Sequence, residues 1–187
     1  MLVLFVLSLA GVNNSLVGYE EGVNSQWGNV ETQYQRRADL IPNLVSTVKG
    51  YVSHEEKVLA EVTDARASVG KVKIDISSAT SEQIASYMAA QSQLSGALSK
   101  LLAVVESYPD LKANENFLVL QAQLEGTENR IGTERHRYNE AVKDYNAARK
   151  GFFTNMIVSI AGMDFERSYP YFKADEGSDK APTVSFE

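Results

Sequence analysis

Apolar and small residues recur every three or four positions along residues 114–163, a stretch without proline. The stripe runs from Phe117 to Phe152, and Glu134 is the one charged residue on it. A 3-4 repeat of this length is typical of one helix that packs against other helices. At about 1.5 Å per residue that helix would measure roughly 60–70 Å. The pattern therefore predicts an all-α fold whose main element is a very long C-terminal helix, with Asn114 as its N-cap.

Three shorter segments carry the same periodicity. The first continues from an apolar start to Pro42, which is expected to end or sharply redirect it. The second runs from about Pro42 to Ser68, and the third runs from its cap at Ser81 to Pro109, which stops it. Short connections make sequential helices antiparallel neighbours. We therefore expect an up-down-up-down antiparallel four-helix bundle over residues 18–163.

The chain opens with MLVLFVLSLAGV, in which Ser8 is the single polar residue. A transmembrane helix needs about 20 apolar residues, and this run is shorter. It fits the inner part of a membrane anchor, a short or oligomerised anchor or signal-peptide core, or a buried N-terminal helix turn. We favour an anchor over residues 1–17 that uses membrane lipid as its partner. The side of the membrane stays open, because the nearest basic residues lie far along the chain. The anchor candidates are Leu2, Val3, Leu4, Phe5, Val6, Leu7 and Leu9.

Helical periodicity stops near residue 164, and residues 164–187 are predicted to form an irregular tail that is acidic and aromatic. The apolar stretch Gly151–Met163 and the aromatic tail residues are expected to contact a neighbouring subunit. Contact with lipid or burial under the tail is the alternative for the stretch, and a frayed terminus is the alternative for the tail. The candidate oligomer contacts are Phe152, Phe153, Ile157, Tyr169, Tyr171 and Phe172.

Length and charge narrow the class of protein. The 187 residues suit one folded domain, with 44% hydrophobic and 22% charged residues. A net charge of −6 disfavours nucleic acid as a partner, since nucleic-acid binding needs a basic surface. The chain has no cysteine, so disulfides, thiolate metal sites and cysteine nucleophiles are excluded.

The two histidines give no catalytic or metal-binding pattern. His54 begins HEEKV, which lacks the second histidine of a zinc-protease helix. A di-iron site in a helical bundle would need a glutamate three residues before His136, and that position holds no glutamate. We therefore expect no cofactor, no metal and no enzymatic activity.

Charged residues gather at two places that we expect to lie close together. Arg36, Arg37 and Asp39 precede Pro42, and Arg37 occupies a position on the apolar stripe. Our hypothesis is that charges from these places pair across the first, second and fourth helices and fix their register. The alternative is a salt-bridged outer face. The partners on the long helix would be Glu125, Glu128, Arg130, Glu134 and Arg135.

Three motifs in order resemble the LemA proteins of bacteria: RRADLIPNLVSTVKGY (36–51), YPDLKANENFLVLQAQLEGTENRI (108–131) and RHRYNEAVKDYN (135–146). The resemblance extends from about Asn14 to the tail motif YPYFKA. It implies a helical-bundle protein with an N-terminal membrane anchor and no established enzymatic activity. Members of the family commonly have a longer apolar segment before the stretch that corresponds to NNSLV.

These observations predict a membrane-anchored helical scaffold that self-associates into a homo-oligomer at the bacterial envelope. A monomeric, membrane-tethered module that recruits an envelope protein is the alternative. An unrecognised hydrolase is a third class, and it would require His54 and His136 for activity.

Overall fold

The computed structural model describes residues 2–52, 55–72, 74–161 and 169–173, and for residues 2–8, 152, 153 and 161 it describes the backbone alone. These residues form helices and connecting turns without any strand, which confirms the all-α class. The helices are α1 (Leu2–Lys49), α2 (Glu56–Lys71), α3 (Ser81–Val105), α4 (Pro109–Lys112), α5 (Glu115–Lys150) and α6 (Phe152–Ala161).

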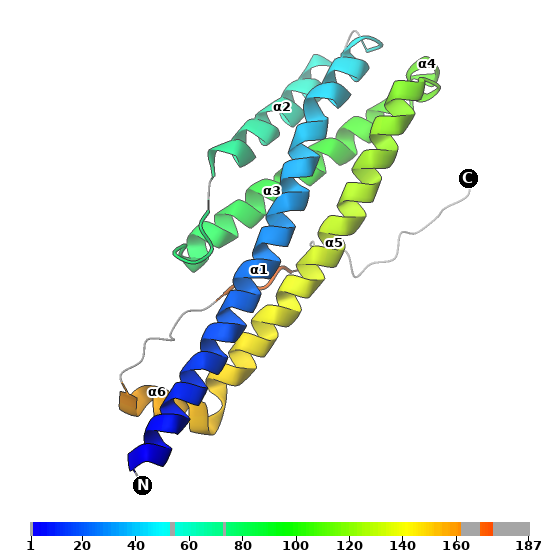
Figure 1. Ribbon diagram of the computed structural model, residues 1–187. Coiled ribbons are helices and arrows are strands. Elements are labelled where there is room, and N and C mark those ends of the chain that lie inside the picture. The colour runs from blue at the N-terminus through cyan, green and yellow to red at the C-terminus, as the bar shows by residue number, and fades with distance from the viewer. Residues whose placement is uncertain (1, 53–54, 73, 162–168, 174–187) are drawn as a thin grey trace, which may run out of the picture.

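Two long antiparallel helices, α1 and α5, lie side by side and form the frame of the molecule (Figure 1). The α2–α3 hairpin lies beside the half of this pair that contains the end of α1, and the short α4 leads into α5 there. At the other end, α6 packs against α1 and α5 near the N-terminus. The molecule is therefore broader where four helices run together and narrower toward the N-terminus.

The prediction that Pro42 ends the first helix is wrong, because α1 continues through it to Lys49. Proline has no N–H, so the carbonyl of Ala38, four residues earlier, loses its usual helical donor. The Nε–H of Arg66 on α2 donates to that carbonyl over 2.9 Å. A side chain from the neighbouring helix thus replaces the missing hydrogen bond, and the second helix begins only at Glu56.

The long C-terminal helix is shorter than predicted. Helix α5 has 36 residues and ends at Lys150, whereas α1 has 48 residues and is the longer of the two. Gly151 breaks the helix with an extended backbone (ψ 137°), and α6 follows as a separate element. Asn114 caps α5 as predicted, because its Oδ1 accepts from the N–H of Phe117 over 3.0 Å. The cap of α3 is Thr80 instead of Ser81.

The core consists of two clusters along α1. One is aliphatic, contains Ile41, Leu44 and Val48 of α1, and lies where α2 and α3 flank the long pair. The other is rich in aromatic rings and contains Trp27 and Tyr34 of α1. Burial of such rings and aliphatic side chains, at roughly 25 cal/mol per Å² of apolar surface, is what holds the helices together.

The predicted anchor lies at the start of α1. The side chains of its candidates Leu2, Val3, Leu4, Phe5, Val6 and Leu7 fall outside the description, and Leu9 is half-buried. Within the part of the chain that the structure describes, no helix has the length and apolar character needed to cross a membrane. The predicted boundary between residues 17 and 18 falls inside the continuous helix α1.

Candidate functional site: a buried arginine, a groove and a docked tail segment

A completely buried arginine joins three helices. The side chain of Arg37 on α1 has no exposed surface. Its Nη1 donates to Glu128 Oε1 on α5 over 2.8 Å and to Ser95 Oγ on α3 over 2.5 Å. Its Nη2 donates to the backbone oxygen of Gln91 over 3.1 Å and to Gln91 Oε1 over 2.6 Å. A buried charge is costly unless it is paired and hydrogen-bonded, and here four acceptors compensate the guanidinium.

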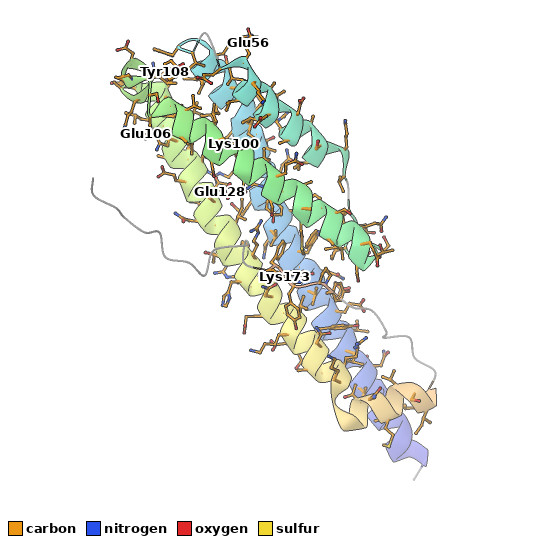
Figure 2. The ribbon with its side chains drawn as sticks, turned by 180° about the vertical axis from the view of Figure 1, so that it is seen from behind. Glu56, Lys100, Glu106, Tyr108, Glu128 and Lys173 are labelled. Atoms are coloured by element: carbon orange, nitrogen blue, oxygen red, sulfur yellow. The ribbon has the colours of Figure 1, made fainter. Side chains whose placement is uncertain are left out.

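Arg37 reaches this position because it lies on the buried face of α1. Tyr34 precedes it by three residues and Ile41 follows it by four, and both are about 1% exposed. The guanidinium also lies 5.2 Å from the centre of the Tyr34 ring. Arg37 therefore lies between the aromatic cluster and the aliphatic cluster, at the level of Glu128, which is labelled on α5 in Figure 2.

The other predicted register residues are placed differently. Arg36 and Asp39 are exposed, and Asp39 accepts a hydrogen bond from Gln35 on the same helix over 2.7 Å. Glu134 pairs with Arg137, three residues along α5, over 2.8 Å. Of the acidic candidates on α5, the structure therefore brings Glu128 to the buried arginine.

Two partners of Arg37 were not among the sequence candidates. Gln91 lies on the apolar stripe of the third helix, and a polar residue at such a core position could have indicated a partner for a buried charge. Ser95 gives no such signal, because serine is common along the exposed faces of this chain.

A groove of about 470 Å³ opens beside this network between α1, α2 and α3. Its lining includes Glu31, Tyr34, Arg66, Tyr87 and Gln91. Burial raises the pKa of the Glu31 carboxyl, and the negative charge of Asp75 raises it further. Burial likewise raises the pKa of Tyr34, and raises that of Tyr87 to about 12. The two phenols are therefore neutral near pH 7, and the groove combines aromatic surface with one acidic and one basic side chain.

His54 lies outside the description, and His136 is exposed. Within the described ranges, no group of three or more His, Cys, Asp or Glu side chains is arranged to hold a metal ion.

A segment of the tail, residues 169–173, lies against the long helices near the aromatic cluster. Tyr169 is 2% exposed, and the ring of Phe172 stacks on Trp27 with centres 6.0 Å apart. Tyr171 is exposed, whereas Ile157 on α6 is buried. The side chains of Phe152 and Phe153 lie outside the description. Tyr169 and Phe172, two of the predicted oligomer contacts, thus pack against their own chain.

Comparison with known proteins gives a consistent family. The model of the LemA family matches residues 26–186. The magnetosome protein MamQ 2 of Paramagnetospirillum magneticum is 26% identical over 199 aligned positions, which cover 95% of this chain and 70% of that protein. MamQ of Magnetospirillum gryphiswaldense is 26% identical over 178 positions, covering 86% of this chain and 65% of that protein. Protein LemA of Metamycoplasma hominis is 21% identical over 154 positions, covering 82% and 67%.

Proposed function

The chain belongs to the LemA family, and from that premise we propose that it is a non-enzymatic, membrane-anchored scaffold that self-associates at the bacterial envelope. The observation that carries this proposal is the continuity of α1, which runs without a break from the apolar N-terminal residues into the rod formed with α5. A helix that enters lipid at one end and packs against α5 at the other would hold the rod at a fixed direction to the membrane.

Two features of the N-terminal end support contact with lipid. The first twelve residues contain one polar side chain. Helix α6 lies at the same end (Figure 1), and it exposes Met156 (44%) and Ile160 (63%), which are four residues apart and so lie on one face. Apolar side chains on one helix face, next to an apolar terminus, favour an interfacial location.

The broad end supports the bundle and scaffold parts of the proposal. We propose that α1, α2, α3 and α5 form the predicted four-helix bundle there, because the aliphatic cluster draws residues from all four. On its surface, Leu118 and Val119 of α5 are 47% and 56% exposed. Exposed aliphatic pairs of this kind are candidates for contact with another subunit.

Fractionation of cells that produce the full chain tests this function. We expect the protein in the membrane fraction after a carbonate wash, and a discrete homo-oligomer after detergent extraction. Leu4→Asp together with Leu7→Asp should move the chain to the soluble fraction, because two charges in an apolar anchor are costly. Leu118→Asp with Val119→Asp at the opposite end is the matched control and should stay in the membrane. A wild-type chain in the soluble fraction would contradict the anchor.

The second candidate function is a monomeric module that recruits an envelope protein. The groove between α1, α2 and α3 favours it, because aromatic surface with one carboxylate and one guanidinium suits a polypeptide ligand. A monomer in the detergent extract would support this alternative over the scaffold.

A further inference from the structure

Residues 169–173 of the tail are held on α5 through the backbone of one residue. The Nδ2 of Asn139 donates to the backbone oxygen of Phe172 over 2.9 Å, and Asn139 Oδ1 accepts from the N–H of Phe172 over 2.9 Å. One amide side chain therefore satisfies both backbone groups of one residue, as a paired strand would. Recognition through backbone groups is a common way for a protein to hold an extended peptide.

The ring of Phe172 occupies an aromatic site made by both long helices. It stacks on Trp27 of α1 with an interplanar angle of 13°, and meets Tyr138 of α5 edge-on with ring centres 5.2 Å apart. The guanidinium of Arg135 lies 5.1 Å from the ring centre. Stacked, edge-on and cation–π contacts together define a site for an aromatic side chain.

A second position is filled by Tyr169. Its ring meets Tyr145 edge-on at 5.3 Å, and its hydroxyl donates to Glu20 Oε1 on α1 over 3.1 Å. Between these two residues of the segment, Tyr171 is 43% exposed and accepts a hydrogen bond from Asn146 over 3.1 Å. The surface therefore contacts three groups of the segment: the side chain of a tyrosine, the ring of an aromatic residue three positions later, and the backbone of that aromatic residue.

We propose that this surface of α1 and α5 is a peptide-binding groove that takes the Tyr169–Lys173 segment of a second copy of the chain. The contacts above join the segment to side chains of α1 and α5, so the same segment from another copy can make every one of them. Exchange of an identical element between copies is a low-cost route to dimers. This inference rests on the proposed self-association and identifies the contact through which two copies would pair.

Effective concentration decides between the segment of the same chain and that of a second copy. The tether gives the segment of the same chain a high effective concentration at its own groove, and the proposed anchoring of copies in one membrane would raise the concentration of the second copy's segment so that exchange competes. Reciprocal exchange also gives a closed pair, because each copy offers one groove and one segment.

A complementation experiment tests the proposal. Asn139→Ala damages the groove and leaves the segment intact, whereas Phe172→Ala damages the segment and leaves the groove intact. We expect each full-length variant alone to lose pairing through this site, and an equimolar mixture to recover it. Because the chain has no cysteine, single introduced cysteines allow donor and acceptor dyes to be attached for energy transfer. We expect transfer in the mixture at least five-fold above either variant alone, and equal transfer would overturn the exchange.

Further variants make the outcome specific. Lys173→Ala, on an exposed residue of the same segment whose side chain takes part in none of the contacts given above, is the matched control and should leave pairing intact. Circular dichroism verifies that each variant remains helical. If Asn139→Ala unfolds, a labelled peptide of residues 169–173 replaces it: the Phe172→Ala chain should bind this peptide, and the absence of binding would overturn the groove. The double variant Asn139→Ala with Phe172→Ala separates the two proposals. If it stays oligomeric, the proposed scaffold stands, and the contact through residues 169–173 is not what holds the copies together.

Discussion

The ion pair between Arg37 and Glu128 gives a quantitative test of the network that joins α1 to α5. The two atoms lie 2.8 Å apart, Arg37 is fully buried and the Glu128 side chain is 38% exposed. At this distance two unit charges attract by about 1.5 kcal/mol in bulk water and by about 6 kcal/mol at an effective dielectric constant of 20. Because water reaches Glu128, we expect the coupling near the lower limit, at about 1.5–2.5 kcal/mol.

Single substitutions should cost different amounts. Glu128→Gln removes one charge but leaves Arg37 with Ser95 and Gln91 as acceptors, so we expect a loss of about 1–2 kcal/mol. Arg37→Met keeps an unbranched apolar stem but removes the guanidinium, and it leaves the buried Gln91 Oε1 without its donor. We therefore expect a loss of about 2–4 kcal/mol.

The double variant completes the thermodynamic cycle. Urea unfolding of the detergent-solubilised chain, followed by circular dichroism at 222 nm, gives the free energy of unfolding of each variant. We expect the double variant to lose less than the sum of the single losses, by the coupling energy given above. Arg36→Met is the matched control, because Arg36 is the exposed neighbour, and its cost should stay within about 0.5 kcal/mol. Additive losses would refute the assignment of the pair as a coupled contact.

Three further predictions follow from other contacts. Because burial raises the pKa of Glu31, the folded state binds the proton of this carboxyl more tightly than the unfolded state does. Tighter proton binding stabilises the fold at low pH, and this stabilisation is lost as pH rises through the pKa of Glu31 in the folded state. Glu31→Gln should therefore raise the melting temperature at pH 8 and lose that advantage below about pH 4.5; an equal effect at both pH values would contradict it. Arg66→Met should cost about 1 kcal/mol of unfolding free energy in the wild-type chain but almost nothing together with Pro42→Ala, whose N–H can bond the Ala38 carbonyl. Asn114→Ala should cost about 1 kcal/mol through loss of the α5 cap, whereas Asn114→Asp should restore it, as thermal unfolding can measure.

The helical class could be predicted because burial follows the 3-4 pattern closely. Trp27, Tyr34 and Ile41 lie on the stripe read from the sequence, and all three are buried. The end of the first helix could not be predicted in the same way. The local cost of Pro42 argues for a break, and the donor that compensates it, Arg66, comes from another helix.

The break between α5 and α6 escaped the pattern for a different reason. Both elements are helical and apolar on one side, so the periodicity runs past Gly151 with little disturbance. The position of the tail segment could not be predicted either, because Phe172 is held by Asn139 and Trp27, which are far away in the sequence. No helical or strand period marks such a segment, so its aromatic residues suggested contact with another subunit.

The position of Arg37 explains why a buried charge is useful in a core that apolar contacts already hold together. Burial of apolar surface is non-directional, so two long stripes can slide past each other by one helical turn, about 5.4 Å, at modest cost. A slide of α5 by four residues would replace Glu128 opposite Arg37 with Leu124 or Gly132, and the buried guanidinium would lose its charged partner. Removing one partner of a buried pair typically costs about 3–5 kcal/mol, and somewhat less where the partner is half-exposed. We infer that the network selects the register of α5 on α1 more strongly than it adds to stability.

The same comparison applied to α3 gives a weaker constraint. A slide of α3 by four residues in one direction brings Ser95 to the place of Gln91 and Ser99 to the place of Ser95, and both carry acceptors for a guanidinium. Arg37 would then keep part of its hydrogen bonding. We therefore expect the polar network to fix the register of α5 on α1 and to leave the position of the α2–α3 hairpin freer.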